Sequence, residues 1–198
     1  MDVYSNCPSV ENDHFLLRQT VMEDCADLLQ VYSDEMAVPY FNSDNCYGDD
    51  FHYKTHARML QAIDFWEKSY LRRDFVRWSI IDKRCGHAIG TIELFHRDAD
   101  DDFTNTGLLR LDLRSDYEKA TIIEEILSLL IKDAFDWFEC ATLSTKAIPE
   151  AVKRRKALEN LGFRECINTI KGHHGERYGS YFMLPKMHKQ KKYANKNV

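Results

Sequence analysis

The sequence lacks the features that mark membrane-spanning, secreted and zinc-ribbon proteins. No apolar run approaches the roughly 18 residues that a transmembrane helix needs. Residues 1–13 are polar and show no signal-peptide pattern. The six cysteines form no Cys-x-x-Cys pair: they are Cys7, Cys25, Cys46, Cys85, Cys140 and Cys166. Their scatter predicts free thiols in a cytoplasmic protein, with neither a disulfide framework nor a zinc ribbon.

A positive net charge and an interdomain linker are also missing. The formal net charge of the 198 residues is −5, so we expect no nucleic-acid partner, and no membrane partner either. Hydrophobic residues make up 44% and charged residues 30%, as in an ordinary soluble protein. The sequence predicts a flexible N-terminal tail over 1–14, one domain over 15–185 and a basic, solvated C-terminal tail over 186–198.

What the chain does contain is a strand that runs into a long helix, within residues 107–139. Three leucines alternate with two charged residues in the first part: Leu109, Leu111, Leu113, Arg110 and Asp112. This alternation predicts a strand with one buried face. Apolar residues then recur every three or four positions through 121–138, which predicts one buried face of a helix. The turn between them, 114–119, exposes backbone N–H groups at the positive end of the helix, where a phosphate can bind, although it contains no glycine.

Apolar periodicity and turn residues predict the other elements. The predicted strands cover 15–18, 75–81, 87–95, 142–145, 163–170 and 180–184, with a hairpin at 75–95. The predicted helices cover 20–38, 53–71 and 149–161. Thr20 and Glu23 form a capping-box pattern at the first of these helices. Pro149 stands in the first turn of the last helix, and Gly162 ends it.

Three stretches, in their order and spacing, make the chain resemble the GNAT N-acetyltransferase superfamily. They are Leu17-Arg18 before the first helix, Ala88 to Leu94, and Arg154 through Leu161-Gly162-Phe163. The chain is most similar to the branch that includes the ribosomal-protein N-terminal acetyltransferases, over nearly its whole length. The resemblance implies an α/β (α+β) fold with a mixed, mostly antiparallel central sheet flanked by helices. A β-α-β core lies at the fourth and fifth strands of such a sheet.

The resemblance also implies acetyl-CoA as the acyl donor. Its pantetheine would lie where the fourth strand, 107–113, splays from the fifth, 142–145, and its pyrophosphate would lie on the turn before the long helix. The implied cofactor-binding residues are Leu111, Asp112, Leu113, Arg114, Ser115, Tyr117, Glu118 and Lys119.

This turn departs from the family pattern, which is Arg/Gln-x-x-Gly-x-Gly/Ala. Tyr117 and Lys119 stand where the glycines would be, and Asp116 and Glu118 would repel a pyrophosphate. An asparagine and a tyrosine that the family often uses elsewhere would fall at two apolar positions, Ala151 and Leu158. The sequence therefore leaves two functions open: an N-acetyltransferase, or a non-catalytic binding or regulatory module with a degenerate phosphate turn.

Aminolysis of a thioester needs a base for the amine and donors for the oxyanion and the thiolate. The candidate catalytic residues are Glu93, Asp112 and Tyr181. Either carboxylate would hold a water or take the proton of the amine, and the structural alternative is a cross-strand ion pair, for example with Arg110. Tyr117 or Tyr181 would donate to the thioester, and the alternative for each is a purely structural role.

The acceptor of such a reaction is a primary amine: a protein N-terminus, a small amine or an aminoglycoside-like metabolite. The acidic segments 44–50 and 99–103 favour a cationic acceptor by long-range attraction. His52 and His56 have the spacing of two ligands on one helix face, but no third and fourth ligand are in range, so we expect no metal site. We expect the protein to be a monomer or a homodimer.

Overall fold

Eight strands form one sheet in the part of the chain that the computed structural model describes, residues 2–187. They are β1 (Val10–Glu11), β2 (Phe15–Gln19), β3 (Val76–Asp82), β4 (His87–Arg97), β5 (Thr106–Leu113), β6 (Thr142–Lys146), β7 (Arg164–Glu165) and β10 (Tyr181–Pro185). Their order in the sheet is β1-β2-β3-β4-β5-β6-β10-β7, and the β5–β6 pair is parallel. Two further strands, β8 (Ile170–Lys171) and β9 (Arg177–Tyr178), form a separate hairpin. The predicted mixed, mostly antiparallel sheet with a β-α-β core is confirmed.

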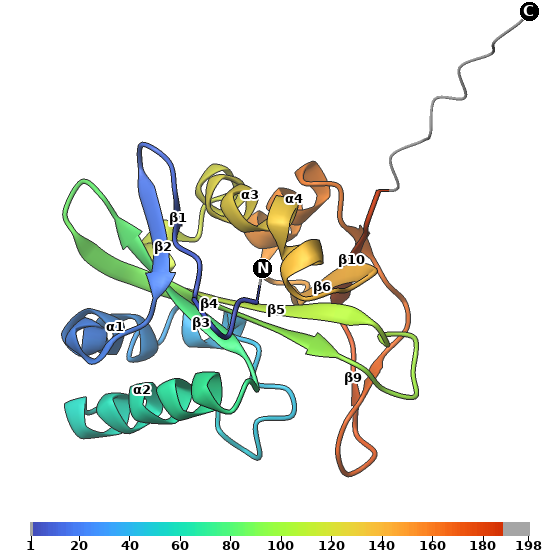
Figure 1. Cartoon of the computed structure of the whole chain (residues 1–198), viewed down its shortest axis with the longest axis horizontal. Helices are drawn as coiled ribbons and strands as arrows, with labels where there is room; N and C mark the ends of the chain where they lie inside the picture. Colours follow the sequence, from blue (N-terminus) through green and yellow to red (C-terminus); the bar gives the residue numbers. More distant parts are fainter. Residues whose placement is uncertain (1, 188–198) are drawn as a thin grey trace, which may run out of the picture.

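Helices cover both faces of this sheet (Figure 1). The helices α1 (Cys25–Tyr32) and α2 (His56–Leu71) lie on one face, and α3 (Ala120–Trp137) and α4 (Val152–Asn160) lie on the other. Because α1 and α2 cover one face of the sheet, the charged residues of β5 face a layer of helices rather than solvent.

Among residues 2–187, no helix is both long and apolar enough to cross a bilayer.

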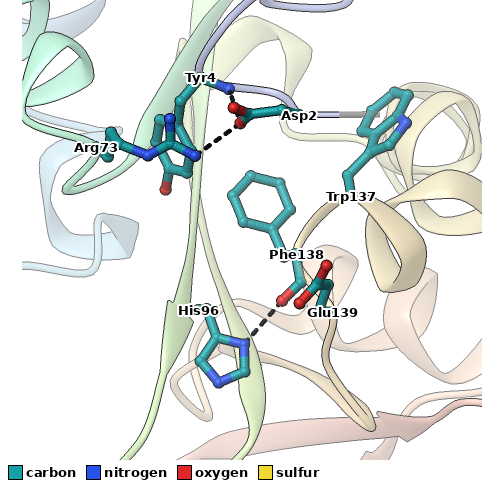
Figure 2. Close-up of a pocket in the computed structure, with 7 residues that line it drawn as sticks. All are labelled: Asp2, Tyr4, Arg73, His96, Trp137, Phe138 and Glu139. Carbon is teal, nitrogen blue, oxygen red and sulfur yellow. Dashed lines mark hydrogen bonds and ion pairs between the residues drawn. The ribbon is translucent and has the colours of Figure 1, made fainter.

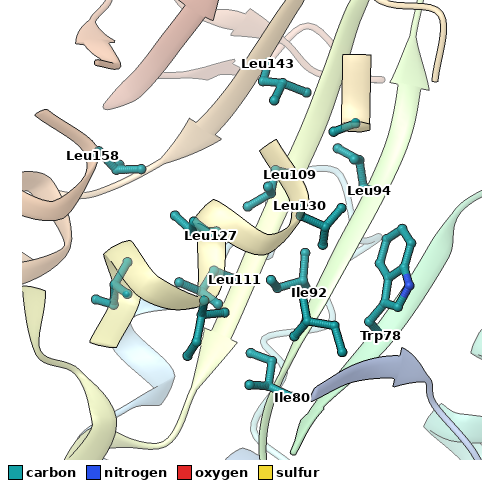
Figure 3. Close-up of a cluster of buried hydrophobic side chains, with 14 of the residues drawn as sticks. Trp78, Ile80, Ile92, Leu94, Leu109, Leu111, Leu127, Leu130, Leu143 and Leu158 are labelled. Atoms are coloured by element: carbon teal, nitrogen blue, oxygen red, sulfur yellow. The ribbon is translucent and has the colours of Figure 1, made fainter. Parts of the chain in front are cut away.

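The largest apolar core lies between the sheet and α3 (Figure 3). The three leucines of β5 belong to it, as the alternation predicted, and Leu127 and Leu130 of α3 pack over them. A second core lies under α1 and α2, and aromatic residues such as Tyr32 and Trp66 contribute to it.

Two predicted helix starts are wrong. At the first, Asp24 and not Glu23 makes the cap, because its carboxylate accepts a hydrogen bond from the backbone N–H of Val21 (3.1 Å). Asp24 is buried and also binds Arg18 (2.8 Å). At the last helix, α4 begins at Val152, so Pro149 lies before the first turn.

Residues 2–14 pack on the domain and do not form the predicted flexible tail. Val3 is buried in the main core, and the carbonyl of Pro8 accepts a hydrogen bond from Nε1 of Trp78 (2.8 Å). Strand β1 pairs with β2. Burial of Val3 and the β1–β2 ladder explain why this polar segment is ordered. The predicted basic tail lies outside the described residues from 188 onward.

Gly90 marks a close approach of β4 to β5. A Cβ atom built at this position would lie 2.3 Å from the carbonyl oxygen of Asp112, a backbone atom that cannot turn away. We expect Gly90→Ala to lower the free energy of unfolding by about 1–3 kcal/mol in urea titrations, the usual cost of overpacking. Gly179→Ala is the matched control, because its Cβ would meet its nearest neighbour at 3.8 Å. Equal losses in the two variants would mean that the strands are not held closely together at Gly90.

Candidate active site

Strand β5 extends beyond the end of its parallel neighbour β6. They pair from Thr106 opposite Thr142 to Leu109 opposite Thr145, and β5 then continues to Leu113 without a β6 partner. The carbonyl of Leu111 is therefore free from the β5–β6 ladder, and it accepts a hydrogen bond from Nη1 of the buried Arg154 (2.8 Å). Past the end of β6, an arginine side chain therefore holds the edge of β5, and the splay that the resemblance implied stays a prediction.

In the turn from β5 to α3, the backbone N–H groups of Ser115, Tyr117, Glu118 and Lys119 already have acceptors. The N–H of Ser115 donates to the carboxylate of Asp34 (2.9 Å). The N–H groups of Tyr117, Glu118 and Lys119 donate to carbonyls inside the turn, at 3.0, 3.1 and 2.7 Å. These donors are consequently engaged, and a carboxylate holds one of them.

The side chains of the turn are engaged in the same way. Glu118 accepts two hydrogen bonds from Arg154, at 2.9 and 2.8 Å, and both side chains are nearly buried. Arg114 pairs with Asp116 (2.7 Å) inside the turn. The hydroxyl of Tyr117 donates to Asp82 (2.8 Å).

A pocket of about 350 Å³ opens beside this turn. Its lining residues are Met36, Tyr40, Ser115, Glu118, Glu150, Ala151, Val152 and Lys153. The two glutamates outnumber the single lysine, so the charge on its wall does not favour a polyanion. We call this space the turn pocket.

The opposite face of the sheet carries a buried cluster of charged side chains. Oε1 of Glu93 accepts a hydrogen bond from Nη1 of Arg110 (2.6 Å), and its Oε2 accepts one from Arg77. Arg77 also donates to Oδ2 of Asp112 (3.1 Å), which accepts a second hydrogen bond from the hydroxyl of Tyr32 (2.7 Å). The ion pair between Glu93 and Arg110, the structural alternative from the sequence, is confirmed.

Burial affects the two carboxylates of this cluster differently. Burial alone would raise the pKa of Glu93, but the charges of Arg77 and Arg110 outweigh it and hold the pKa below its ordinary value. Burial raises the pKa of Asp112, and Arg77 and Tyr32 compensate only in part. Oδ1 of Asp112 has no hydrogen-bond partner within residues 2–187. Glu93 is therefore a fixed carboxylate and a poor base, whereas Asp112 is a basic group without access to solvent.

Tyr181 lies in a second polar cluster, close to β6. Its hydroxyl donates to Oδ2 of Asp44 (3.0 Å) and accepts from Nδ2 of Asn42 (3.2 Å). Asp44 also pairs with Lys146 at the end of β6 (2.7 Å). Burial, and then the nearby charge of Asp44, raise the pKa of Tyr181. Tyr181 is fully buried, so its hydroxyl reaches no open pocket in this arrangement.

Glu93 and Arg110 form part of the wall of two adjoining pockets, of about 430 and 650 Å³. The smaller one is lined by six aromatic rings, and we call it the aromatic pocket: Tyr47, Phe51, Tyr53, Phe65, Trp66 and Phe75. Of the three candidate catalytic residues, Glu93 faces these pockets, while Asp112 and Tyr181 are buried behind them.

Figure 2 shows another pocket, of about 720 Å³, formed where the N-terminal segment meets β4 and the end of α3. Arg73 pairs with Asp2 (2.9 Å) across it, and a ring N–H of His96 donates to the carbonyl of Phe138 (2.7 Å). These polar groups satisfy one another. We therefore place the candidate active site on β4 and β5 and not in this pocket.

A family model described as "Acetyltransferase (GNAT) domain" matches residues 14–164. The chain belongs to the GNAT acetyltransferase family. Members of this family are acyl-CoA-dependent N-acetyltransferases, and this GNAT protein is one of them. No protein with a curated description matches the sequence. The family match does not favour the alternative of a non-catalytic module.

Solved structures of acetyltransferases share the fold of this GNAT protein. A ribosomal-protein-S5-alanine acetyltransferase from Vibrio fischeri is 18% identical, with a TM-score of 0.61, over 91% of this chain and 96% of that chain. A GNAT-family acetyltransferase from Bacillus anthracis is 14% identical, with a TM-score of 0.64, over 90% and 98%. RimJ from Mycobacterium smegmatis, solved in complex with CoA-disulfide, is 15% identical, with a TM-score of 0.65, over 86% and 81%. At these identities the likeness concerns the fold.

The GNAT family uses acetyl-CoA, and the turn of this protein does not fit its phosphates as it stands. The N–H of Ser115 is held by Asp34, and Glu118 and Glu150 line the pocket where negative charge would have to enter. Arg154, which could pair with a phosphate, is held by Glu118. The edge of β5 at Leu111, which β6 leaves unpaired, would suit the extended pantetheine arm of acetyl-CoA. Arg154, however, already donates a hydrogen bond to the carbonyl of Leu111.

Sequence reasoning did not identify three residues that shape the site: Arg77, Arg154 and Asp34. Arg77 was visible as a charged residue within an apolar strand, a pattern that often indicates a buried pair. Arg154 was part of the family resemblance, but nothing in the sequence indicated that it pairs with Glu118. Asp34 gave no signal, because it lies 81 residues from Ser115.

Proposed function

We propose that this protein moves an acetyl group from acetyl-CoA to a primary amine by direct aminolysis. The observation that carries this proposal is the edge of β5 that β6 leaves unpaired beside a walled pocket, within a chain of the GNAT family. When bound, acetyl-CoA would supply a thioester: the amine nitrogen bonds to its carbonyl carbon, the C–S bond breaks, and coenzyme A leaves as a thiolate that takes up a proton. We also propose a cytoplasmic location, because all six thiols are unpaired.

Each candidate residue has a distinct proposed task. Glu93, ionised between two arginines, fixes the guanidinium groups of Arg77 and Arg110 in the pocket wall, and so acts as a positioning residue. Asp112 fixes the guanidinium of Arg77 from behind, and so acts as a positioning residue. Tyr181 donates a hydrogen bond to Asp44 and so positions Asp44 next to the end of β6, where Asp44 also binds Lys146. The amine proton leaves by way of water in the pocket, because none of these groups combines access with a suitable pKa.

The donor enters, in this proposal, at the turn pocket. Arg154 is the charged residue beside this turn that would pair with a phosphate, and in the structure it is held by Glu118. The residues of the turn therefore offer no ready phosphate site, and the donor would depend on Arg154 for positive charge.

Incubation with acetyl-CoA and a panel of primary amines tests the proposed function, with the acetylated product identified by mass spectrometry. We expect a product whose formation depends on the protein and on the amine. Absence of every acetylated amine, together with no heat of acetyl-CoA binding at millimolar concentration, would refute it.

Removing the charge of Glu118 is expected to tighten acetyl-CoA binding. Glu118→Gln keeps one acceptor for Arg154 but removes a carboxylate from the turn pocket, which should improve binding by about 1–2 kcal/mol for a partly screened charge. Isothermal titration measures this change. Glu124→Gln is the matched control, because Glu124 lies further along α3 and pairs with Asn160 (2.7 Å). Unchanged or weaker binding by the Glu118 variant would mean that the phosphates do not approach this turn.

A further inference from the structure

We propose that the aromatic pocket binds the acceptor, and that this acceptor carries an aromatic ring and a carboxylate beside its primary amine. This is the chemistry of an aromatic amino acid. The inference rests on the proposed function and narrows its acceptor to one class. Three independent features of the pocket region support it: its walls, its floor and its neighbouring acidic surface.

The walls are suited to a flat apolar group. Six rings surround a space of about 430 Å³, a volume in the range of small-molecule sites. Two of these rings stay in contact with water: the side chain of Tyr47 is 84% exposed and that of Phe65 is 55% exposed. Exposed aromatic side chains that line a pocket mark a binding surface, because a bound ring would bury them.

The floor has more hydrogen-bond donors than acceptors. Arg77 and Arg110 both line it, and Glu93 is the carboxylate that they share. The Nε–H of each arginine is buried and has no acceptor within residues 2–187. The second carboxylate of the cluster, Asp112, pairs with Arg77 from behind the pocket. A floor of two guanidinium groups and one shared carboxylate favours a ligand that brings a carboxylate of its own.

The neighbouring surface is acidic. A second space of about 410 Å³ shares the segment from Asn45 to Tyr47 with the aromatic pocket. It is lined by four carboxylates, those of Asp44, Asp49, Asp50 and Glu176, and Asp49 pairs with Arg58 (2.5 Å). Asp44 also pairs with Lys146 at the end of β6, so this acidic surface borders that end of the strand. A protonated amine is attracted to that side, toward the proposed entry of the acetyl group.

Together, the walls, the floor and the acidic surface favour a zwitterionic ligand that carries an aromatic ring. They disfavour an aminoglycoside-like acceptor, whose many hydroxyl and ammonium groups would meet aromatic walls that cannot hydrogen-bond to them. They also disfavour a plain polyamine, which offers nothing to the two arginines.

Isothermal titration without acetyl-CoA tests the proposal with four matched probes. L-Tryptophan carries the ring, the carboxylate and the amine; tryptamine lacks the carboxylate, indole-3-propionate lacks the amine and L-alanine lacks the ring. We expect L-tryptophan to bind most tightly, and loss of either charged group to weaken binding about tenfold, as for a charge-assisted contact. Tryptamine or L-alanine binding as tightly as L-tryptophan, or kanamycin binding more tightly, would overturn the proposal.

Two variants assign the binding to this pocket. Phe65→Ala should weaken L-tryptophan binding about fivefold, an effect typical of one aromatic contact. Leu71→Ala is its control, because Leu71 is also exposed on α2 and does not line the pocket. Arg110→Lys should bring the affinities for L-tryptophan and tryptamine closer together. If Phe65→Ala and Leu71→Ala weakened L-tryptophan binding equally, the ligand would not bind in the aromatic pocket.

The same probes separate this inference from the proposed function. L-Tryptophan that binds but is not acetylated, while other amines are acetylated, would refute this inference and leave the proposed function intact; acetylation of no amine, with no heat of acetyl-CoA binding, would refute the proposed function. Acetylation of other amines by a protein that does not bind L-tryptophan would refute this inference alone.

Discussion

Replacing Arg77 with methionine is expected to lower the free energy of unfolding by about 3–5 kcal/mol, the usual cost of removing one partner from a buried ion pair. Arg77 is 3% exposed and binds the carboxylates of both Glu93 and Asp112. Glu93 retains Arg110, but Asp112 keeps only the hydroxyl of Tyr32 among these partners. Methionine fills similar space beside Trp66, so the loss reports on charge rather than on a cavity. Urea unfolding monitored by circular dichroism measures it.

The pH dependence of this variant follows from Asp112. Its pKa already lies above the ordinary value because of burial, and loss of Arg77 raises it further. A carboxyl group with a raised folded-state pKa stabilises the fold at low pH, and that contribution is lost as pH rises through the folded-state pKa. Arg77→Met should therefore lose more stability relative to the wild type at pH 8 than at pH 5. Arg77→Met/Asp112→Asn should recover at least about 1 kcal/mol, because contacting residues are coupled. A loss below about 1 kcal/mol for Arg77→Met would contradict the buried pair.

Leu130→Ala is expected to cost about 2–5 kcal/mol, through lost burial and the cavity left behind. Leu130 is fully buried on α3 and packs over the leucines of β5 (Figure 3). The cost should lie in the upper part of this range, because the sheet beneath cannot collapse into the space. Differential scanning calorimetry and urea titration both measure it.

Lys132→Ala is the matched control for that variant. Lys132 lies on the exposed side of the same helix, two residues further on, and its loss should change stability by less than about 0.5 kcal/mol. If Leu130→Ala also stayed within that limit, the buried face of α3 would be assigned wrongly.

The elements of the fold were largely predictable because their signals are local. The leucines of β5 recur every second residue, and the apolar face of α3 recurs every third or fourth, so each face follows from its own segment. The burial of Arg110 and Asp112 was not predictable in this way. It depends on α1 and α2 covering the second face of the sheet, and on Arg77 arriving from β3.

The site was less predictable, because its contacts join distant segments. The ion pair of Glu93 and Arg110 was foreseen as one of two alternatives, since cross-strand neighbours can be inferred from a hairpin-like order. Arg154 lies 43 residues from Leu111, whose carbonyl it binds. No periodicity relates these two positions. The absence of turn glycines was readable from the sequence, but the contacts of Asp34 and Arg154 with the turn were not.

The position of β10 has a practical consequence for handling this protein. The family match ends at residue 164, whereas β10 lies between β6 and β7 in the sheet. A recombinant fragment cut at the limits of the match would leave β6 as a bare edge, with its backbone N–H and C=O groups open to another molecule. Such a fragment would precipitate or form fibrils by edge-to-edge pairing, and its insolubility would say nothing about the enzyme.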